Sequence, residues 1–472
     1  MLLARASPDA YHSILNSGDP MPPQPDLFDR DDATGAMLAD LLARAPQVLV
    51  KKLSNNDRDW ARLANKHQAG VYIPPVQRDG GFFPPLAVKA RAGKGADEIR
   101  EVFFLTEWPQ VDEQRTTRLV NYTSKGAETH MTGLPKAAFG DLGPASWLVM
   151  APRPGAAEPV YLCLTIESGS DAAGVLIETL GLGADFVVGV LAPAAVVAQE
   201  RDLIMDFAEE VAAAWLAGDV ARFADDRAAM PNTTALAELA RTAFLHGCGM
   251  ATLDPFALDA PGDAIREISR VIEWDLFRDY QRKERAVELV RALFGDQPAE
   301  MSMRSVVRRM VDSVGEIDRI MLSASQQRKS RAGYSFEHQI EAMLVAGKIP
   351  FAKQVIMDAK KRPDFVLPSL KHLRADLKGP AKGLILSAKT TLRERWKQVE
   401  REMGGSDLFL ATVDETIAAN AIEEMALMNI TLVVPESLKS SKSTEYVRHA
   451  NVVDFKSFFG RELRHTRMPA WV

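Results

Sequence analysis

The first part of the chain contains short hydrophobic runs separated by turn-forming residues. Between Val48 and about Leu191 these runs are rich in β-branched and aromatic residues, which is typical of strands. Many short strands at this spacing predict a small barrel or sandwich. The runs are GVYIPPV (70–76), EVFFLTEW (101–108), SWLVMAP (146–152), VYLCLTI (160–166) and FVVGVLAP (186–193).

The pattern changes near Pro193. Residues 194–324 carry hydrophobic side chains at helical spacing, with helix-stopping and capping residues around 218–235. After Gln326, short hydrophobic runs alternate with helical segments, which predicts an α/β domain with a mixed sheet. The predicted elements are a helix over 335–347, strands over 363–368, 383–389, 407–413 and 430–435, and a helix over 391–403.

These patterns divide the chain into four parts. Residues 1–45 are rich in Pro and Asp early on and predict a poorly ordered lead-in. We expect a mainly-β domain over 46–195, a helical linker over 196–235 and the α/β domain over 236–472. The fold class is therefore multidomain.

Composition adds little. The chain has 472 residues, of which 47% are hydrophobic and 25% charged, as is ordinary for globular proteins. No hydrophobic run approaches the roughly 18–20 residues of a membrane span, and the start has too short a hydrophobic region for a signal peptide. Cys163 and Cys248 fit no metal-binding or redox spacing. We expect a cytoplasmic protein without a membrane partner.

Charge is spread unevenly. The net charge is −6, but residues 353–402 hold 13 Lys and Arg against 6 Asp and Glu. A local basic face can bind a polyanion even on an acidic protein. On charge alone, a solvated helix face is the more ordinary explanation.

Two residues of this basic region suit phosphodiester chemistry. Asp364 begins one predicted strand and Lys389 ends the next, where Ser387 and Lys389 point to the face opposite Leu384, Leu386 and Ala388. Carboxylates hold hard cations such as Mg²⁺, while a lysine can orient a water nucleophile and balance charge. From the residues alone, a strand-capping aspartate and a surface lysine are the more ordinary explanation.

Four segments in this region carry a more specific pattern. The segments are RKSRAGYSFE (328–337), KRPDFVLPS (361–369), LSAKTTLRERW (386–396) and LVVPESL (432–438). In their sequences, order and spacing they resemble the catalytic domain of EcoRII-type restriction endonucleases, which are members of the PD-(D/E)xK superfamily. The resemblance implies a restriction-endonuclease-like α/β fold, a mixed sheet flanked by helices, and Mg²⁺-dependent cleavage of double-stranded DNA.

The resemblance also implies roles for single residues. Asp364 would be the first metal-binding carboxylate and Lys389 the catalytic lysine. Glu402 would be the remaining active-site acid and a second metal ligand. Glu337 would be a supporting acid near the metal, although a helix-surface glutamate beside His338 is the alternative.

A further motif concerns base recognition. Arg393, Glu394 and Arg395 resemble the R-(D/E)-R motif with which related enzymes read CC:GG. Arginine can bind guanine O6 and N7 with two hydrogen bonds, and a carboxylate accepts from cytosine N4. The alternative is that these charges only solvate a helix start.

The N-terminal half resembles the family more faintly. Residues 51–74 are similar to the start of the EcoRII-type effector domain, a DNA-binding pseudobarrel. His67 and Tyr72 fall on positions that contact DNA there, with ordinary core packing as the alternative. Lys125 and Glu128 lie in 121–133, which maps loosely onto the family's basic recognition loop.

Taken together, the resemblance implies a type IIE restriction endonuclease of the EcoRII kind. It would be a homodimer or tetramer that cuts a short palindromic or near-palindromic site containing CC:GG. Its N-terminal domain would bind a second copy of the site and otherwise inhibit cleavage, and a cognate DNA methyltransferase would accompany it. Two alternatives stay open: an inactive DNA-binding protein on the same fold, and a nuclease that is non-specific or dependent on modification.

Overall fold

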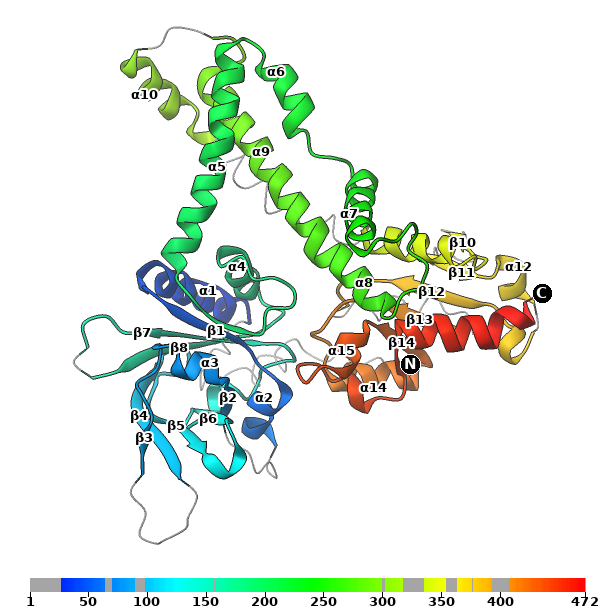
Figure 1. Cartoon of the computed structure of the whole chain (residues 1–472), viewed down its shortest axis with the longest axis horizontal. Helices are drawn as coiled ribbons and strands as arrows, with labels where there is room; N and C mark the ends of the chain where they lie inside the picture. The colour runs from blue at the N-terminus through cyan, green and yellow to red at the C-terminus, as the bar shows by residue number, and fades with distance from the viewer. Residues whose placement is uncertain are drawn as a thin grey trace, which may run out of the picture.

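The computed structural model describes most of the chain and shows three parts in sequence order (Figure 1). A β-rich part comes first, helices follow, and an α/β part ends the chain. Among the described residues, no helix is long and apolar enough to cross a membrane. The described residues are 27–63, 70–89, 98–156, 158–298, 302–316, 335–353, 363–375, 377–392 and 407–471.

The N-terminal part is built on one nine-stranded sheet. Its order is β2-β6-β5-β4-β8-β7-β1-β9, with β3 paired to β4. All pairs are antiparallel apart from the parallel pair β4 and β8. Each of the five predicted runs contains a strand. The strands are β1 (Val48–Lys52), β2 (Val71–Ile73), β3 (Ala87–Val88), β4 (Ile99–Trp108), β5 (Glu113–Tyr122), β6 (Thr129–Thr132), β7 (Trp147–Pro152), β8 (Val160–Ile166) and β9 (Val188–Leu191).

Helices cover one face of this sheet. Helices α1 (Leu27–Arg44) and α4 (Asp171–Thr179) contribute to one hydrophobic cluster, whereas aromatic side chains such as Phe104 fill a second cluster. The predicted lead-in is wrong from residue 27 onward, because α1 buries Leu38 and Leu41 against the sheet. The last part of this lead-in carries apolar residues at helical spacing, but the Pro- and Asp-rich composition of its earlier part obscured that signal. Two short helices, α2 (Asn55–Arg62) and α3 (Pro75–Asp79), follow β1 and β2.

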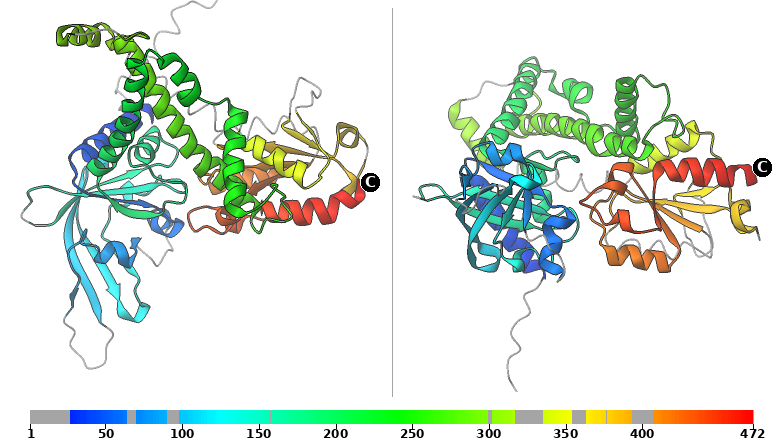
Figure 2. Two further views of the ribbon diagram at one scale, coloured as in Figure 1. Left: turned by 45° about the horizontal axis from the view of Figure 1, so that its top comes forward. Right: turned by 60° about the horizontal axis from the view of Figure 1, so that its bottom comes forward.

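The middle of the chain is helical. Helices α5 and α9 pack together, and α9 reaches from that contact to the C-terminal part (Figure 2). Helices thus continue past the linker of 196–235 and lie within the stretch 194–324, where the pattern predicted helices. The helices are α5 (Pro193–Leu216), α6 (Val220–Phe223), α7 (Thr233–Cys248), α8 (Pro261–Glu267), α9 (Glu273–Phe294) and α10 (Met303–Asp312).

The C-terminal part contains a mixed six-stranded sheet in the order β10-β11-β12-β13-β14-β15. Strands β12 to β15 run parallel, while β10 and β11 pair antiparallel. All four strands predicted here are present, so the prediction of a mixed α/β sheet is confirmed. The strands are β10 (Ala352–Lys353), β11 (Phe365–Leu367), β12 (Leu384–Ala388), β13 (Asp407–Ala411), β14 (Ile430–Val434) and β15 (Val452–Asp454).

Helices cover both faces of this second sheet. One hydrophobic cluster joins the sheet to α7, α8, the helical residues 335–346 and the C-terminal helix η11 (Phe458–Arg467). Helix α14 (Ala419–Leu427) packs in the cluster on the other face. In β12, Leu384, Leu386 and Ala388 lie in the first cluster and Ile385 in the second, as the predicted alternation requires.

Phe458 lies in the first of these clusters, and its substitution tests how much the packing there contributes to stability. It is fully buried, with its ring centroid 5.1 Å from that of Phe409 and 5.4 Å from that of Phe459. We expect Phe458→Ala to cost about 3–5 kcal/mol, which lowers the melting midpoint of a domain this size by roughly 6–20 °C. Calorimetry checks this, with Val447→Ala as the control because Val447 is exposed. A midpoint equal to that of the control would contradict this account of the core.

Candidate active site and its contact with the N-terminal domain

The pairing of β11 with β12 brings Asp364 and Lys389 together. The strands are antiparallel, with Phe365 opposite Leu386, so the start of β11 lies beside the end of β12. Oδ2 of Asp364 accepts a hydrogen bond from Lys389 Nζ at 2.9 Å and another from the Ala388 backbone N–H at 2.7 Å. Lys389 keeps 31% of its side chain exposed, so the pair can meet a ligand from solvent.

Glu337 interacts electrostatically with this pair from the helical residues 335–346. Burial, followed by the negative charge of Asp364, raises the pKa of Glu337 to about 7, although Lys389 and Lys353 act in the opposite direction. Two carboxylates that share a poorly hydrated site disfavour each other's charged form. A cation bound beside these two carboxylates would favour the charged form of both.

Sequence reasoning missed a polar cluster next to Glu337. Lys353 Nζ lies 2.5 Å from Glu341 Oε2, and His338 Nδ1 lies 3.8 Å from the same oxygen. The other ring nitrogen of His338 lies 3.3 Å from the Thr234 hydroxyl, and burial is the main cause that lowers the pKa of His338. The spacing of Glu337 and Glu341, four residues apart on a helix, was the available signal.

Several predicted residues lie outside the described part of the chain. These are His67, Arg393, Glu394, Arg395 and Glu402, and the side chain of Lys125 is also outside it. Within the described residues, no group of three or more His, Cys, Asp or Glu side chains could hold a metal ion. The structure thus brings together Asp364, Lys389 and Glu337 from the predicted set.

In the N-terminal part, Tyr72 and Glu128 lie near His130. Tyr72 is opposite His130 in the pairing of β2 with β6, and their ring centroids are 5.8 Å apart. Val71 and Ile73 on either side of Tyr72 are buried in the core, whereas Tyr72 is half-buried on the other face. Glu128 is exposed, with Oε2 3.9 Å from His130 Nε2.

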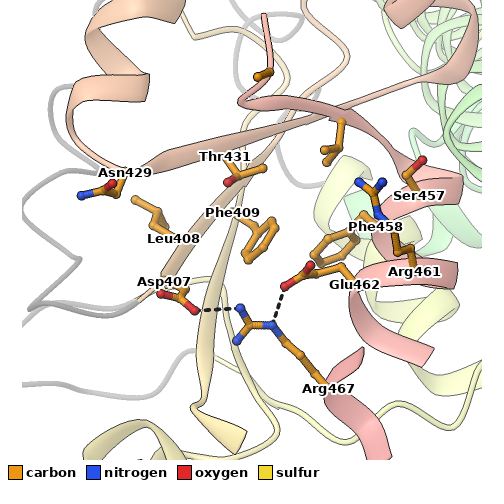
Figure 3. Close-up of a pocket in the computed structure, with 12 residues that line it drawn as sticks. Asp407, Leu408, Phe409, Asn429, Thr431, Ser457, Phe458, Arg461, Glu462 and Arg467 are labelled. Carbon is orange, nitrogen blue, oxygen red and sulfur yellow. Dashed lines mark hydrogen bonds and ion pairs between the residues drawn. The ribbon is translucent and has the colours of Figure 1, made fainter. Parts of the chain in front are cut away.

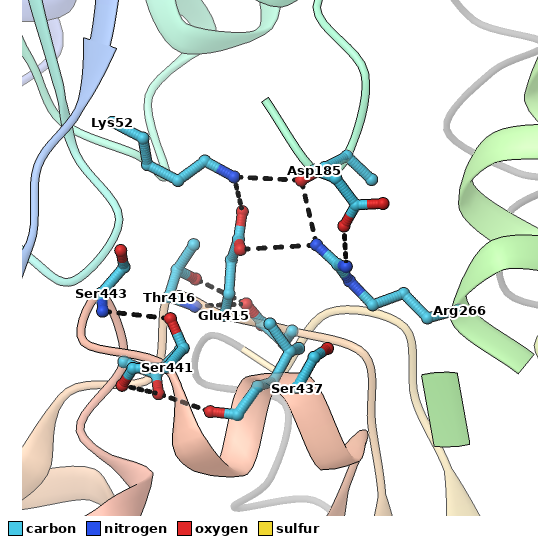
Figure 4. A network of polar contacts seen from close by, with 12 residues as sticks. Lys52, Asp185, Arg266, Glu415, Thr416, Ser437, Ser441 and Ser443 are labelled. Carbon is cyan, nitrogen blue, oxygen red and sulfur yellow. Dashed lines mark hydrogen bonds and ion pairs between the residues drawn. The ribbon is translucent and has the colours of Figure 1, made fainter. Parts of the chain in front are cut away.

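The N-terminal part is bound to the C-terminal part through a first group of charges (Figure 4). Lys52 Nζ donates to Glu415 Oε1 at 2.8 Å and to the Ala184 carbonyl at 3.1 Å. Arg266 pairs with Asp185 and lies 3.9 Å from Glu415. Lys52 is 6% exposed, so this pairing is largely shielded from water.

A second group lies between α2 and the segment 442–446. Arg58, which is 1% exposed, pairs with Glu445 and also donates to the Leu142 carbonyl at 3.0 Å. Asn55 donates from its backbone to Lys442 O at 2.8 Å and from its side chain to Thr444 O at 2.7 Å. We call these two groups together the interdomain contact.

The interdomain contact lies on the same edge of the sheet as Lys389. Glu415 follows β13, which runs parallel to β12, and the Lys389 backbone N–H donates to the Ala411 carbonyl at 2.9 Å. Residues 442–446 follow β14 and α15 (Glu436–Ser440). The N-terminal part therefore covers loops at the carboxyl ends of the parallel strands, where Asp364 and Lys389 also lie.

A pocket lies at the opposite edge of this sheet (Figure 3). It is lined by Asp407 at the start of β13 and by residues of η11. Arg467 closes one side through ion pairs to Asp407 at 2.7 Å and to Glu462 at 2.6 Å. These contacts fix the end of the chain to the sheet and lie away from Lys389.

Comparison with known proteins assigns the C-terminal part. A family model described as EcoRII C terminal matches residues 298–459. These residues are similar to the C-terminal domain of EcoRII over the matched range. The predicted family is thereby confirmed for this part of the chain, which includes Asp364, Lys389 and Glu337.

Two relatives and one solved structure are similar to the chain. The type II restriction enzyme EcoRII of Escherichia coli is 35% identical over 152 residues, which cover 32% of this chain and 37% of EcoRII. The type II restriction enzyme SsoII of Shigella sonnei is 27% identical over 159 residues, which cover 31% of this chain and 50% of SsoII. The chain thus spans half or less of the length of each relative. Metal-depleted Ecl18kI in complex with uncleaved, modified DNA is 22% identical, with a TM-score of 0.42, over 56% of this chain and 85% of that chain.

Proposed function

We propose that this protein is a type II restriction endonuclease that hydrolyses phosphodiester bonds in double-stranded DNA. The observation that carries the proposal is the Asp364–Lys389 pair, joined at 2.9 Å at one edge of a mixed sheet within the range similar to the EcoRII C-terminal domain. A carboxylate and a lysine at such an edge suit the hydrolysis of a phosphate diester, since one group can hold a cation and the other can orient a nucleophile.

The donor set of this site fits Mg²⁺. Asp364 and Glu337 supply hard oxygen donors. Burial and then the charge of Asp364 raise the pKa of Glu337 to about 7, and a cation bound nearby would favour its charged form. We assign metal binding to Asp364 and Glu402, with Glu337 as the supporting acid. When bound, the ion polarises the phosphate and lowers the pKa of a coordinated water.

Lys389 has two tasks in this proposal. Its ammonium group can donate hydrogen bonds to the attacking water and to a phosphate oxygen, which orients the nucleophile and offsets developing negative charge. In the reaction, a bond forms between the water oxygen and phosphorus while one P–O bond to a sugar oxygen breaks. The Asp364 contact fixes the position of Lys389 before DNA binds.

For specificity, we propose that Arg393, Glu394 and Arg395 read CC:GG. We expect Arg395→Lys to lose about 1–3 kcal/mol of discrimination, because lysine cannot replace the planar two-point contact of arginine with guanine. The measurement is the ratio of cleavage rates on duplexes that differ at one G of the site. Lys371→Arg, an exposed change in the same domain, is the control. Equal ratios in both variants would contradict the assignment.

Cleavage of both strands at a palindromic or near-palindromic site suits a symmetric assembly. Each subunit of a homodimer would read one half-site and cut one strand. A cognate methyltransferase would protect the same site in the host DNA. Size-exclusion chromatography with light scattering, with and without a site-bearing duplex, distinguishes a monomer, a dimer and a tetramer.

We also propose that the N-terminal part is an effector domain that inhibits cleavage until it binds a second copy of the site. Support comes from the interdomain contact, which joins the N-terminal part to loops at the same edge of the sheet as Lys389. His67, Tyr72, Lys125 and Glu128 would contact the effector DNA.

The test of the proposed function is Mg²⁺-dependent cleavage of a plasmid with one CC:GG site, with and without short site-bearing duplexes. Cleavage at that site with stimulation by the duplex supports the whole proposal. Specific cleavage without stimulation removes only the effector role. Binding without cleavage under any divalent metal would favour an inactive binder, and random fragments would favour a non-specific nuclease.

A further inference from the structure

The four residues from Lys389 to Leu392 are held at both ends, by the last residue of β13 and by the loop that follows it. At one end, the Lys389 backbone N–H donates to the Ala411 carbonyl at 2.9 Å. At the other end, the Leu392 backbone N–H donates to Asp414 Oδ2 at 2.8 Å. In the sequence, Leu392 directly precedes Arg393. These two bonds therefore fix the backbone at Lys389 and at Leu392, the residue that precedes Arg393 in the sequence.

Hydrogen bonds to both of its carboxylate oxygens hold Asp414 in this position. It is 2% exposed, and its Oδ1 accepts from both the backbone N–H and the hydroxyl of Thr416, at 2.9 and 2.7 Å. Its own N–H donates to the Thr412 hydroxyl at 3.0 Å. Because both carboxylate oxygens have donors on opposite sides, the side chain cannot turn without losing a bond to Leu392 or to Thr416.

A second contact joins Asp414 to the surface on which the N-terminal part rests. The hydroxyl of Tyr446 donates to the Asp414 carbonyl, and Tyr446 is fully buried. Burial raises the pKa of this hydroxyl, so it remains a donor. The residue before it, Glu445, pairs with Arg58, and Asn55 binds Thr444.

We infer that Asp414 is a positioning residue for base recognition, and that Tyr446 connects it to the docked N-terminal part. A continuous series of contacts runs from Arg58 through residues 444–446 to Asp414 and on to Leu392. Asp414 does not touch DNA in this account. It fixes the backbone N–H of Leu392, the residue that precedes Arg393 in the sequence. The inference rests on the proposed function, since it assumes cleavage at a site read by Arg393–Arg395.

The test uses Asp414→Asn in the full chain. Asparagine keeps the size of the side chain but has one acceptor oxygen, so either Leu392 or Thr416 loses its partner. We expect the ratio of kcat/KM on the cognate site to kcat/KM on a site with one altered C or G to fall at least fivefold, which is the lower value of one two-point base contact. The rate on the altered site should stay near that of the wild type.

The matched control is Asp454→Asn. Asp454 also accepts a backbone N–H, from Ser457 at 2.6 Å, and it lies at the end of β15, two strands away from β13. A purely structural role for Asp414 would lower both rates together and leave the ratio unchanged. That result in a folded Asp414→Asn protein would overturn the inference.

If Asp414→Asn does not fold, Tyr446→Phe tests the inferred positioning role instead, because it keeps the buried ring and removes one hydroxyl. A fall in the same ratio supports the inference, and an unchanged ratio overturns it. Wild-type protein is assayed alongside. If it cleaves no site specifically, the proposed function fails. If it is specific and the variants match it, only the positioning role fails.

Discussion

Lys389→Ala is expected to reduce DNA cleavage at least about a hundredfold while specific DNA binding stays within a few-fold of the wild type. The lysine is the cation that faces Asp364 at 2.9 Å, and loss of one aimed donor at a reacting centre typically costs this much. Binding should persist because base recognition is assigned to other residues, Arg393, Glu394 and Arg395. Initial cleavage rates and gel-shift titrations in Ca²⁺ measure the two effects separately.

Lys371→Ala is the matched control, since Lys371 is an exposed lysine on α12 (Leu370–Arg374) of the same domain. It should cleave at the wild-type rate. If Lys389→Ala also cleaved at that rate, the active-site assignment would be wrong. Loss of both cleavage and binding, with a lowered melting midpoint, would show a damaged fold and refute the separation of the two functions.

The second large effect is expected from the double variant Glu415→Ala, Glu445→Ala. These carboxylates pair with Lys52 and Arg58, which are 6% and 1% exposed, across the interdomain contact. Removing one partner of a buried ion pair typically costs 3–5 kcal/mol, because the other charge stays buried without compensation. Separation of the two parts hydrates both cations, so the undocked state gains population.

Cleavage of DNA with a single site should therefore rise at least tenfold in this variant, and stimulation by an added duplex should shrink. The control is Glu423→Ala, Glu424→Ala, which changes two exposed glutamates on α14. Cleavage rates on single-site plasmid measure the effect. Rates equal to or below those of the control would show that the interdomain contact does not restrain the active site.

The strands with clear hydrophobic alternation were predictable, whereas those that are exposed along part of their length were not. β12 and β13 bury four or more residues each, and their runs were visible in the sequence. β5 begins Glu113-Gln114-Arg115-Thr116 and is largely exposed there. Because this start is polar, the hydrophobic pattern did not indicate a strand. Its ten-residue pairing with β4 supplies the order that its own sequence does not.

The candidate site, too, could be predicted from the sequence only in part. Asp364 and Lys389 could be predicted because a family motif names them, and the antiparallel pairing of β11 with β12 then accounts for their approach. Asp414 and the interdomain contact carry no motif. Lys52 and Glu415 are 363 residues apart, and a single sequence contains no local signal for such a contact.

The most direct test is digestion of unmethylated phage DNA with Mg²⁺ by the wild-type protein and by Lys389→Ala side by side. We expect discrete bands from the wild type, fragment ends that map to one sequence containing CC:GG, and intact DNA with the variant. Intact DNA in both lanes, or the same bands in both, would contradict this expectation.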